Sequence, residues 1–123
     1  MKKRILVVDD HAVVRQGIQT LMGGQYQICG EAENGLEAIQ KTKELQPDLV
    51  ILDVNMPVMN GLDAAREIRR LCPLTQILIL SLHDTEQLER DAKSAGADAA
   101  LSKSKAPREL RRILEQLLGT ESS

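Results

Sequence analysis

Five short apolar runs recur along the chain, and a segment with helical signals follows each of them. The runs are ILVV (5–8), YQIC (26–29), LVIL (49–52), ILIL (77–80) and AALS (99–102). The first, third and fourth do not alternate polar with apolar residues, which is typical of strands covered on both faces of a parallel sheet. Strands that alternate with helices through short connections predict an α/β fold of five βα units, with helices on both faces of a five-stranded parallel sheet.

The segments between the runs carry helical periodicity and recognisable ends. Capping patterns predict the starts of the second, third and fourth helices: Asn34 with Glu37, Asn60 with Asp63, and Asp84 with Gln87. Pro107 suits the first turn of the last helix, which Gly119 ends. The fourth helix has a thin apolar face, so we expect it to be the least firmly packed element; that face is Leu88, Ala92 and Ala95.

Length and composition limit the classes of function. The 123 residues predict one domain over 1–119, with 120–123 as a tail or the start of a linker. Hydrophobic residues make up 42% of the chain, enough for a core, but the chain has one tyrosine, no phenylalanine and no tryptophan. Few bases or sugars could stack on such a surface, and a net charge of −2 does not suggest a DNA-binding face.

The N-terminal segment and the cysteines indicate the compartment. MKKRILVVDD has four apolar residues before two acids, which is too short for a signal-peptide core or a membrane span. Cys29 and Cys72 lie far apart and in no metal-ligand spacing, so we expect buried free thiols in a reducing cytosol. The sequence therefore predicts a cytoplasmic protein that does not contact a membrane.

Polar residues stand where the predicted strands end. The first strand ends in Asp9 and Asp10, the third in Asp53, the fourth in Ser81 and the fifth in Lys103. Ligands of open α/β sheets bind at this edge, and three converging carboxylates repel each other unless a cation neutralises them. Mg²⁺ prefers such oxygen ligands, while a hydroxyl and an ammonium group can bind phosphate oxygens. The pattern favours a phosphoryl-transfer site with a nucleophilic carboxylate.

Several motifs together resemble those of a known family. ILVVDDH, PDLVILDVNMPVMNG, the LS that ends the fourth run and the lysine that ends the fifth resemble a two-component response-regulator receiver domain, over nearly the whole chain. VVDDHAVVRQG is further similar to the NarL/FixJ (LuxR-type) subfamily. The resemblance implies a flavodoxin-like (CheY-like) doubly wound fold with strand order 2-1-3-4-5.

The same resemblance implies roles for the acidic residues. Asp53 matches the phosphoacceptor, which would become an aspartyl phosphate by attack on the phosphohistidine of a sensor histidine kinase. Asp10 and Asp53 would ligate Mg²⁺ directly, Asp9 would bind it through water, and Asn55 would offer its backbone carbonyl.

Other positions match residues that hold the phosphate or tune its lifetime. Ser81 would hydrogen-bond a phosphoryl oxygen, and Lys103 would pair with the carboxylate and then with the phosphate. Lys105 is nearby, but the family's lysine follows the fifth strand immediately. His83 matches a position at the entrance that tunes hydrolysis, whereas His11 favours a surface or capping role.

The chain departs from the family at residues that transmit the signal. Ala100 stands where receivers have an aromatic residue on the fifth strand, and Leu82 is bulkier than the small residue often found after the serine. Ser104 stands where many receivers have proline. We hypothesise that Ser81 still moves, and that coupling runs through the fourth helix and backbone shifts rather than through a rotating ring.

The domain would pass on its signal through a DNA-binding domain or through a protein partner. The subfamily usually carries a C-terminal helix-turn-helix domain, so DNA contact would come only through such a domain; a stand-alone receiver that binds proteins is the alternative, and a homodimer stays open. We expect no enzyme activity beyond self-catalysed phosphoryl acceptance and slow autodephosphorylation.

Two other classes of protein fit the residues less well. A haloacid-dehalogenase-like Mg²⁺-dependent phosphatase would need a cap domain and an aspartate at position 55, where this chain has Asn55. A nucleotide-binding module would need a glycine-rich loop after the first strand, where this chain has DDHAVV.

Overall fold

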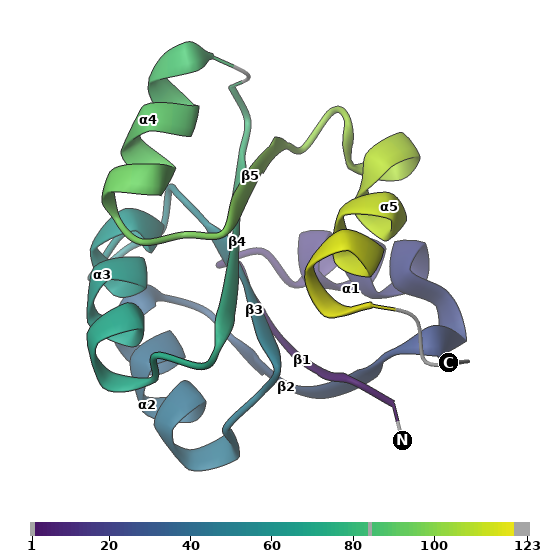
Figure 1. The fold of residues 1–123 in the computed structure, drawn as a ribbon, viewed down its shortest axis with the longest axis horizontal. Helices are drawn as coiled ribbons and strands as arrows, with labels where there is room; N and C mark the ends of the chain where they lie inside the picture. The colour runs from purple at the N-terminus through teal and green to yellow at the C-terminus, as the bar shows by residue number, and fades with distance from the viewer. Residues whose placement is uncertain (1, 84, 120–123) are drawn as a thin grey trace.

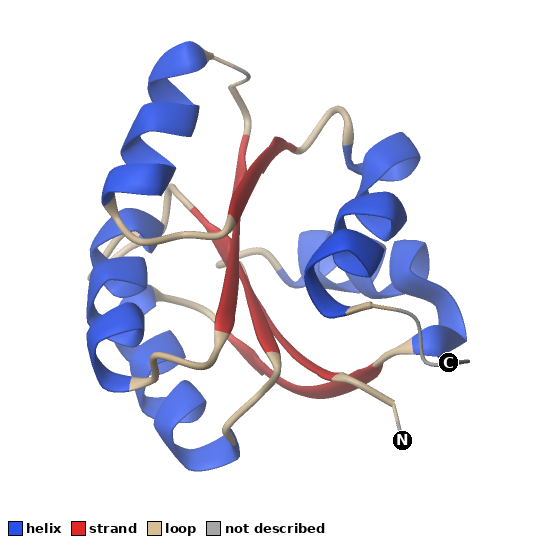
Figure 2. Ribbon diagram, viewed as in Figure 1, coloured by secondary structure: helices blue, strands red, loops and turns tan. Residues whose placement is uncertain are grey.

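The fold is a single parallel sheet with the strand order that the resemblance implies. The computed structural model describes residues 2–83 and 85–119. The sheet order is β2-β1-β3-β4-β5, and every neighbouring pair is parallel. The strands are β1 (Arg4–Val8), β2 (Gln27–Ala32), β3 (Leu49–Asp53), β4 (Gln76–Ser81) and β5 (Ala99–Ser102). Figure 2 shows the strands as a central layer between two layers of helices, and the predicted fold class is confirmed.

Helices cover both faces of the sheet. Figure 1 shows α2, α3 and α4 along one face, with α1 and α5 along the other. The helices are α1 (Ala12–Met22), α2 (Gly35–Leu45), α3 (Gly61–Leu71), α4 (Glu86–Ser94) and α5 (Ala106–Leu118), with a short 3₁₀ turn, η1 (Gly23–Gln25), after α1. Among the described residues, no helix has the length and apolar character that a bilayer crossing requires.

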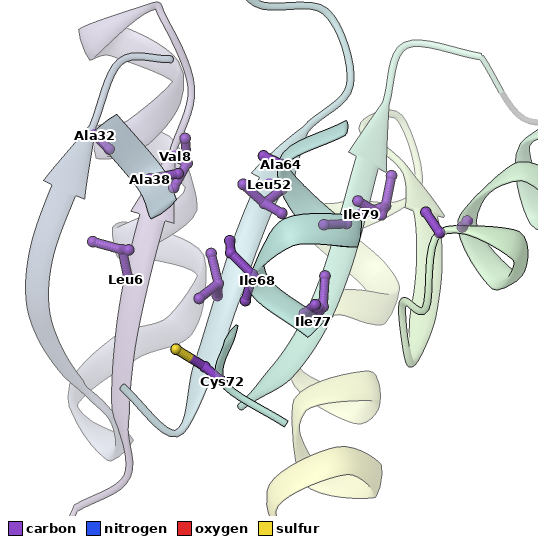
Figure 3. Close-up of a cluster of buried hydrophobic side chains, with 14 of the residues drawn as sticks. Leu6, Val8, Ala32, Ala38, Leu52, Ala64, Ile68, Cys72, Ile77 and Ile79 are labelled. Carbon is purple, nitrogen blue, oxygen red and sulfur yellow. The ribbon is translucent and has the colours of Figure 1, made fainter. Parts of the chain in front are cut away.

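The continuous apolar runs are buried because both faces of their strands meet helices. Alternate strand residues enter two separate cores. Leu6, Val8, Leu52, Ile77 and Ile79 pack with Ile68 of α3 on one face, as Figure 3 shows. The neighbouring residues of the same strands pack on the other face against α1 and α5: Ile5, Val7, Ile51, Leu78 and Leu80. The absence of alternation in the sequence therefore reflects a sheet without a solvent face.

The helix ends agree with the predicted caps except in α4. Asn34 accepts a hydrogen bond from the Glu37 N–H at 2.8 Å, and Asn60 accepts one from the Asp63 N–H at 2.9 Å. In α4 the capping side chain is Thr85, whose hydroxyl oxygen accepts a hydrogen bond from the Leu88 N–H at 3.1 Å. The cap therefore lies one residue later than the predicted pair of Asp84 and Gln87, and that prediction was wrong. Asp84 itself and the predicted tail at 120–123 lie outside the described residues.

The second strand differs from its prediction. We expected 26–29, but Tyr26 precedes the strand, which continues to Ala32. The register with β1 shifts between Ile5 and Leu6, a bulge beside Cys29. Glycine and glutamate in GEA are weak strand formers, so the sequence gives little signal for this part of the edge strand. Backbone pairing with β1 stabilises it. At this edge Cys29 is only partly buried, whereas Cys72 is buried as expected; both are free thiols.

Candidate functional site

The register of the central strands brings the strand-end acids together. Val8 at the end of β1 pairs with Leu52 of β3, so the residues that follow them, Asp9 and Asp53, stand side by side at the carboxyl edge. Asp9 is fully buried and Asp53 is 4% exposed. Two carboxylates from strands about 40 residues apart in the sequence therefore share one buried pocket, as the sequence predicts.

Lys103 joins these two acids. Its ammonium group lies 2.8 Å from Asp9 Oδ2 and 3.1 Å from Asp53 Oδ1. Its backbone N–H donates to the Ser81 carbonyl at 2.7 Å, which ties the end of β5 to the end of β4. Of the two candidate lysines, Lys103 is the one that pairs with both acids, whereas Lys105 precedes α5 at its N-cap position.

The electrostatics of the pocket favour an added cation. Burial raises the pKa of Asp53, the charge of Asp9 raises it further, and Lys103 lowers it only in part. Burial works to lower the pKa of Lys103, but hydrogen bonds and charge from Asp9 and Asp53 outweigh burial and raise it. The lysine stays charged, and the pocket still holds more negative charge than this one ammonium group neutralises.

The donor set beside Lys103 fits a divalent cation. Asp9, Asp10 and His11 can each bring one ligand atom within 4.8 Å of the others. Asp10 Oδ1 is buried and accepts no hydrogen bond within the described residues, although His11 Nδ1 lies 3.1 Å away. A buried carboxylate oxygen without a donor is costly unless a cation takes that place, and carboxylate oxygens are the ligands that Mg²⁺ prefers.

His11 stands in the capping position that the sequence favoured for it. It is the N-cap residue of α1, without a side-chain capping bond. Its backbone N–H donates to Asp9 Oδ1 at 2.9 Å, and its exposed ring stands near both acids. Asp10 is therefore free of the helix cap, and its carboxylate stays available in the pocket.

The remaining predicted residues lie at or just beyond the carboxyl ends of β3 and β4. Ser81 is buried at the end of β4, and its hydroxyl oxygen accepts from the His83 N–H at 3.1 Å, which leaves its hydrogen available for donation. His83 is exposed, and the Leu82 side chain is 66% exposed beside it. Asn55 lies exposed on the loop two residues beyond Asp53.

Gly61 is a positioning residue that sequence reasoning missed. Its N–H donates to the Val54 carbonyl at 2.9 Å, which closes the loop after β3. A Cβ at Gly61 would stand 2.0 Å from the Asp53 carbonyl oxygen. The α3 start therefore packs directly against the backbone of Asp53, and the NG pair at 60–61 was the available signal.

Arg15 is a second residue that was missed. Its guanidinium donates to the Asp9 carbonyl oxygen at 2.6 Å and lies against Glu31 of β2. It belongs to the VVDDHAVVRQG motif, but nothing in a linear sequence shows which carbonyl group an arginine reaches.

Ala100, at the position where receivers have an aromatic residue, lines a groove. It is partly buried on β5, and the groove beside it runs between α4 and β5, lined by Glu89, Ala92, Lys93, Ala97 and the start of β5. The described residues of this groove include no aromatic side chain.

Comparisons with known proteins show which family the chain belongs to. The response regulator receiver domain family matches residues 5–115. The chain is 39% identical over 118 residues to the chemotaxis protein CheY of Thermotoga maritima, covering 95% of this chain and 96% of that protein. It is 36% identical to the nitrate/nitrite response regulator protein NarL of Escherichia coli K12, covering 95% of this chain but only 55% of NarL.

A solved structure extends the likeness to the backbone. The two-component response regulator of the LuxR family from Aurantimonas sp. SI85-9A1 superposes with a TM-score of 0.89 at 34% identity, over 98% of this chain and 88% of that one. The chain belongs to the response regulator receiver domain family, as the receiver domain of a two-component response regulator.

Proposed function

We propose that this domain accepts a phosphoryl group on Asp53 from the phosphohistidine of a sensor histidine kinase, with Mg²⁺ bound beside it. The observation that carries the proposal is the bridge that Lys103 makes between the buried carboxylates of Asp9 and Asp53. Such a pocket offers a nucleophile, a cation site and a mobile positive charge at one edge of the sheet.

The chemistry is a direct phosphoryl transfer. A carboxylate oxygen of Asp53 attacks phosphorus, the P–N bond to the kinase histidine breaks with its electron pair going to the ring nitrogen, and the imidazole leaves as the neutral ring because its other nitrogen keeps the proton that it already carries. Burial and the charge of Asp9 raise the pKa of Asp53, and the hydrogen bond and charge of Lys103 oppose this shift and so favour the ionised, nucleophilic form. The product is a mixed anhydride on Asp53, an aspartyl phosphate.

The metal would be held by the acids that the structure brings together. Asp10 and Asp53 would ligate Mg²⁺, Asn55 would offer its backbone carbonyl, and Asp9 would bind it through water. When bound, Mg²⁺ would neutralise the carboxylates and the phosphoryl oxygens. Asp10 Oδ1 supports this assignment, because it is buried and accepts no hydrogen bond within the described residues. We expect Asp10→Ala to lose Mg²⁺ affinity in a calorimetric titration while its thermal midpoint is kept or raised, because like charges are relieved.

After transfer, side chains already at the pocket would hold the phosphoryl group. The Ser81 hydroxyl can donate a hydrogen bond to one phosphoryl oxygen, and Lys103 can exchange one of its carboxylate partners for a second phosphoryl oxygen. His83 and Leu82 are exposed directly after Ser81, and we expect them to tune water access and so the rate of hydrolysis. The domain would act as a phosphoryl acceptor with slow autodephosphorylation rather than as an enzyme.

Signalling would proceed through the α4 and β5 face without a rotating ring. Ala100 cannot swing as an aromatic residue does, and α4 buries only the small face of Leu88 and Ala92. Backbone amide shifts recorded with and without beryllofluoride and Mg²⁺ test this coupling. We expect perturbed residues between 82 and 105; an unperturbed segment would exclude it.

The output is transcriptional in this proposal. The chain spans about half of NarL, and full-length relatives of that kind support a C-terminal helix-turn-helix domain, which alone would contact DNA. The setting would be the cytoplasm, and a switch in dimer contacts would link phosphate to DNA binding. A stand-alone role is supported by the likeness to CheY of Thermotoga maritima, 96% of whose length is matched.

The test is chemical phosphorylation. We expect acetyl phosphate with Mg²⁺ to give a stoichiometric, acid-stable and base-labile modification, seen by intact-mass spectrometry, that EDTA suppresses. Asp53→Asn should abolish it, and the matched control Asp63→Asn, an exposed acid of α3, should not. Labelling of Asp53→Asn at the wild-type level would place the acceptor elsewhere.

A further inference from the structure

Arg15 connects the end of β1 to the end of β2. Its side chain is 11% exposed, an unusual degree of burial for arginine. One guanidinium nitrogen donates to the Asp9 carbonyl oxygen at 2.6 Å, and Nε donates to Glu31 Oε1 at 2.8 Å. A third nitrogen lies 4.0 Å from Glu33. One planar group thus binds a backbone carbonyl and a carboxylate from two different strand ends.

These bonds complete the anchoring of Asp9. Its N–H donates to the Ala32 carbonyl of β2 at 3.1 Å, and its carbonyl accepts from Arg15. Its carboxylate accepts from Lys103 and from the His11 N–H. The backbone pairing of β1 with β3 ends at Val8, so beyond that residue the Asp9 main chain depends on Arg15 and β2.

We propose that Arg15 is a positioning residue for the metal pocket. By linking the Asp9 carbonyl oxygen to the Glu31 carboxylate, Arg15 sets the direction of the Asp9 and Asp10 carboxylates. The inference rests on the proposed Mg²⁺ site. Arg15 itself touches neither the metal nor the phosphoryl group. Its pairing with Glu31 also neutralises a positive charge that would otherwise repel a cation from the pocket.

The residue type follows from this geometry. A guanidinium presents several N–H donors in a rigid plane, so it can reach a carbonyl and a carboxylate together. A lysine at the same position keeps the charge but offers a compact ammonium on a flexible stem. Arg15→Lys therefore tests geometry at constant charge, and Arg15→Met removes the donors while it keeps most of the apolar stem.

The experiment measures Mg²⁺ affinity by isothermal titration calorimetry. We expect Arg15→Met to weaken binding about 10- to 100-fold, the usual loss when a partner behind a metal ligand is removed, and Arg15→Lys to restore little of it. The control Arg66→Met removes an exposed arginine that pairs with Asp63 within α3, and it should bind Mg²⁺ like the wild type. In the metal-free protein, Arg15→Met should also speed hydrogen exchange of the Asp9 amide.

A second pair of variants covers the case in which Arg15→Met does not fold. Glu31→Gln frees Arg15 from its carboxylate partner, and Glu33→Gln removes the same charge from a residue that Arg15 barely reaches. Equal Mg²⁺ affinity in these two variants would overturn the proposal. A greater loss in Glu31→Gln supports it, because both variants remove one negative charge and only Glu31 accepts a hydrogen bond from Arg15.

The outcomes separate this inference from the proposed function. Unchanged Mg²⁺ affinity in a folded Arg15→Met, with only a lower thermal midpoint, would show that Arg15 contributes to stability alone and would overturn the inference. Tighter binding would show that its charge merely opposes the metal, and would also overturn it. If the wild type itself bound no Mg²⁺ and took no phosphoryl group, the proposed function would fail instead.

Discussion

The ammonium group of Lys103 lies 2.8 Å from the buried carboxylate of Asp9, although 94 residues separate the two in the sequence. In the metal-free protein this lysine is the cation that makes burial of Asp9 tolerable. If the neighbouring acids held a divalent cation, that cation would supply part of the positive charge, and Lys103 could then pair with a phosphoryl group.

Removal of the lysine should make stability depend on metal. We expect Lys103→Met to lower the unfolding free energy of the metal-free protein by about 1–3 kcal/mol, the usual cost of leaving buried polar groups unpaired. Mg²⁺ should recover more stability in this variant than in the wild type. Urea unfolding with EDTA and with Mg²⁺ measures both effects, and the exposed control is Lys43→Met. A variant as stable as the wild type without metal would contradict the role of Lys103 as the resident cation.

Removal of the Asp53 charge should stabilise the metal-free protein at neutral pH. Burial and the nearby Asp9 raise the pKa of Asp53 above its unfolded value. The ionised form is therefore disfavoured in the folded state, a cost fully present above the folded pKa and absent below the unfolded pKa. Asp53→Asn should unfold at higher urea than the wild type near pH 7 in EDTA, and the difference should close as the pH falls to about 4. A constant difference across this range would assign the effect to packing instead of charge.

The loop after Asp53 contains a strained turn at Val58. Its φ is 69°, and the Met59 N–H donates to the Pro57 carbonyl at 2.7 Å, a γ-turn that a β-branched residue adopts unwillingly. The side chain is 78% exposed, so burial does not offset the strain. Asparagine adopts a positive φ more readily than a β-branched residue, and we expect Val58→Asn to gain about 1 kcal/mol, at the low end of such strain energies.

A matched control isolates the effect of conformation. Val13 is equally exposed but lies in the first turn of α1 at an ordinary φ. Val13→Asn removes a similar exposed side chain without relieving strain and should gain nothing. Equal thermal midpoints for the two variants would show that replacement of an exposed valine by a polar side chain, and not relief of the γ-turn, sets the result.

Close packing at Gly61 should be intolerant of a single methyl group. A Cβ would stand 2.0 Å from the Asp53 carbonyl oxygen, so Gly61→Ala must move α3 or the end of β3. We expect a loss of about 1–3 kcal/mol in unfolding free energy, typical of overpacking, together with weaker Mg²⁺ binding. Gly17→Ala is the control, because its Cβ meets nothing within 4 Å and a helical alanine should stabilise. Wild-type stability in Gly61→Ala would show that this loop yields freely.

Much of the fold was readable because local signals and burial agree. The apolar runs at 49–52 and 77–80 became strands covered on both faces, and the caps at Asn34 and Asn60 form as expected. The edge strand β2 and the Thr85 cap were misjudged. Backbone pairing stabilises glycine and glutamate in β2, and the choice between neighbouring capping residues depends on where the chain leaves β4.

The sequence by itself determined the alternation of strands and helices and the acids and the lysine at strand ends, because apolar periodicity and residue type act locally. Only the tertiary structure decided that Lys103 bridges Asp9 and Asp53, that Arg15 holds the Asp9 carbonyl, and that Gly61 packs on the backbone of Asp53. Those relationships join residues that are distant in the chain. They follow from the strand register and from the reach of the side chains, and neither is fixed until the sheet has formed and its helices have packed.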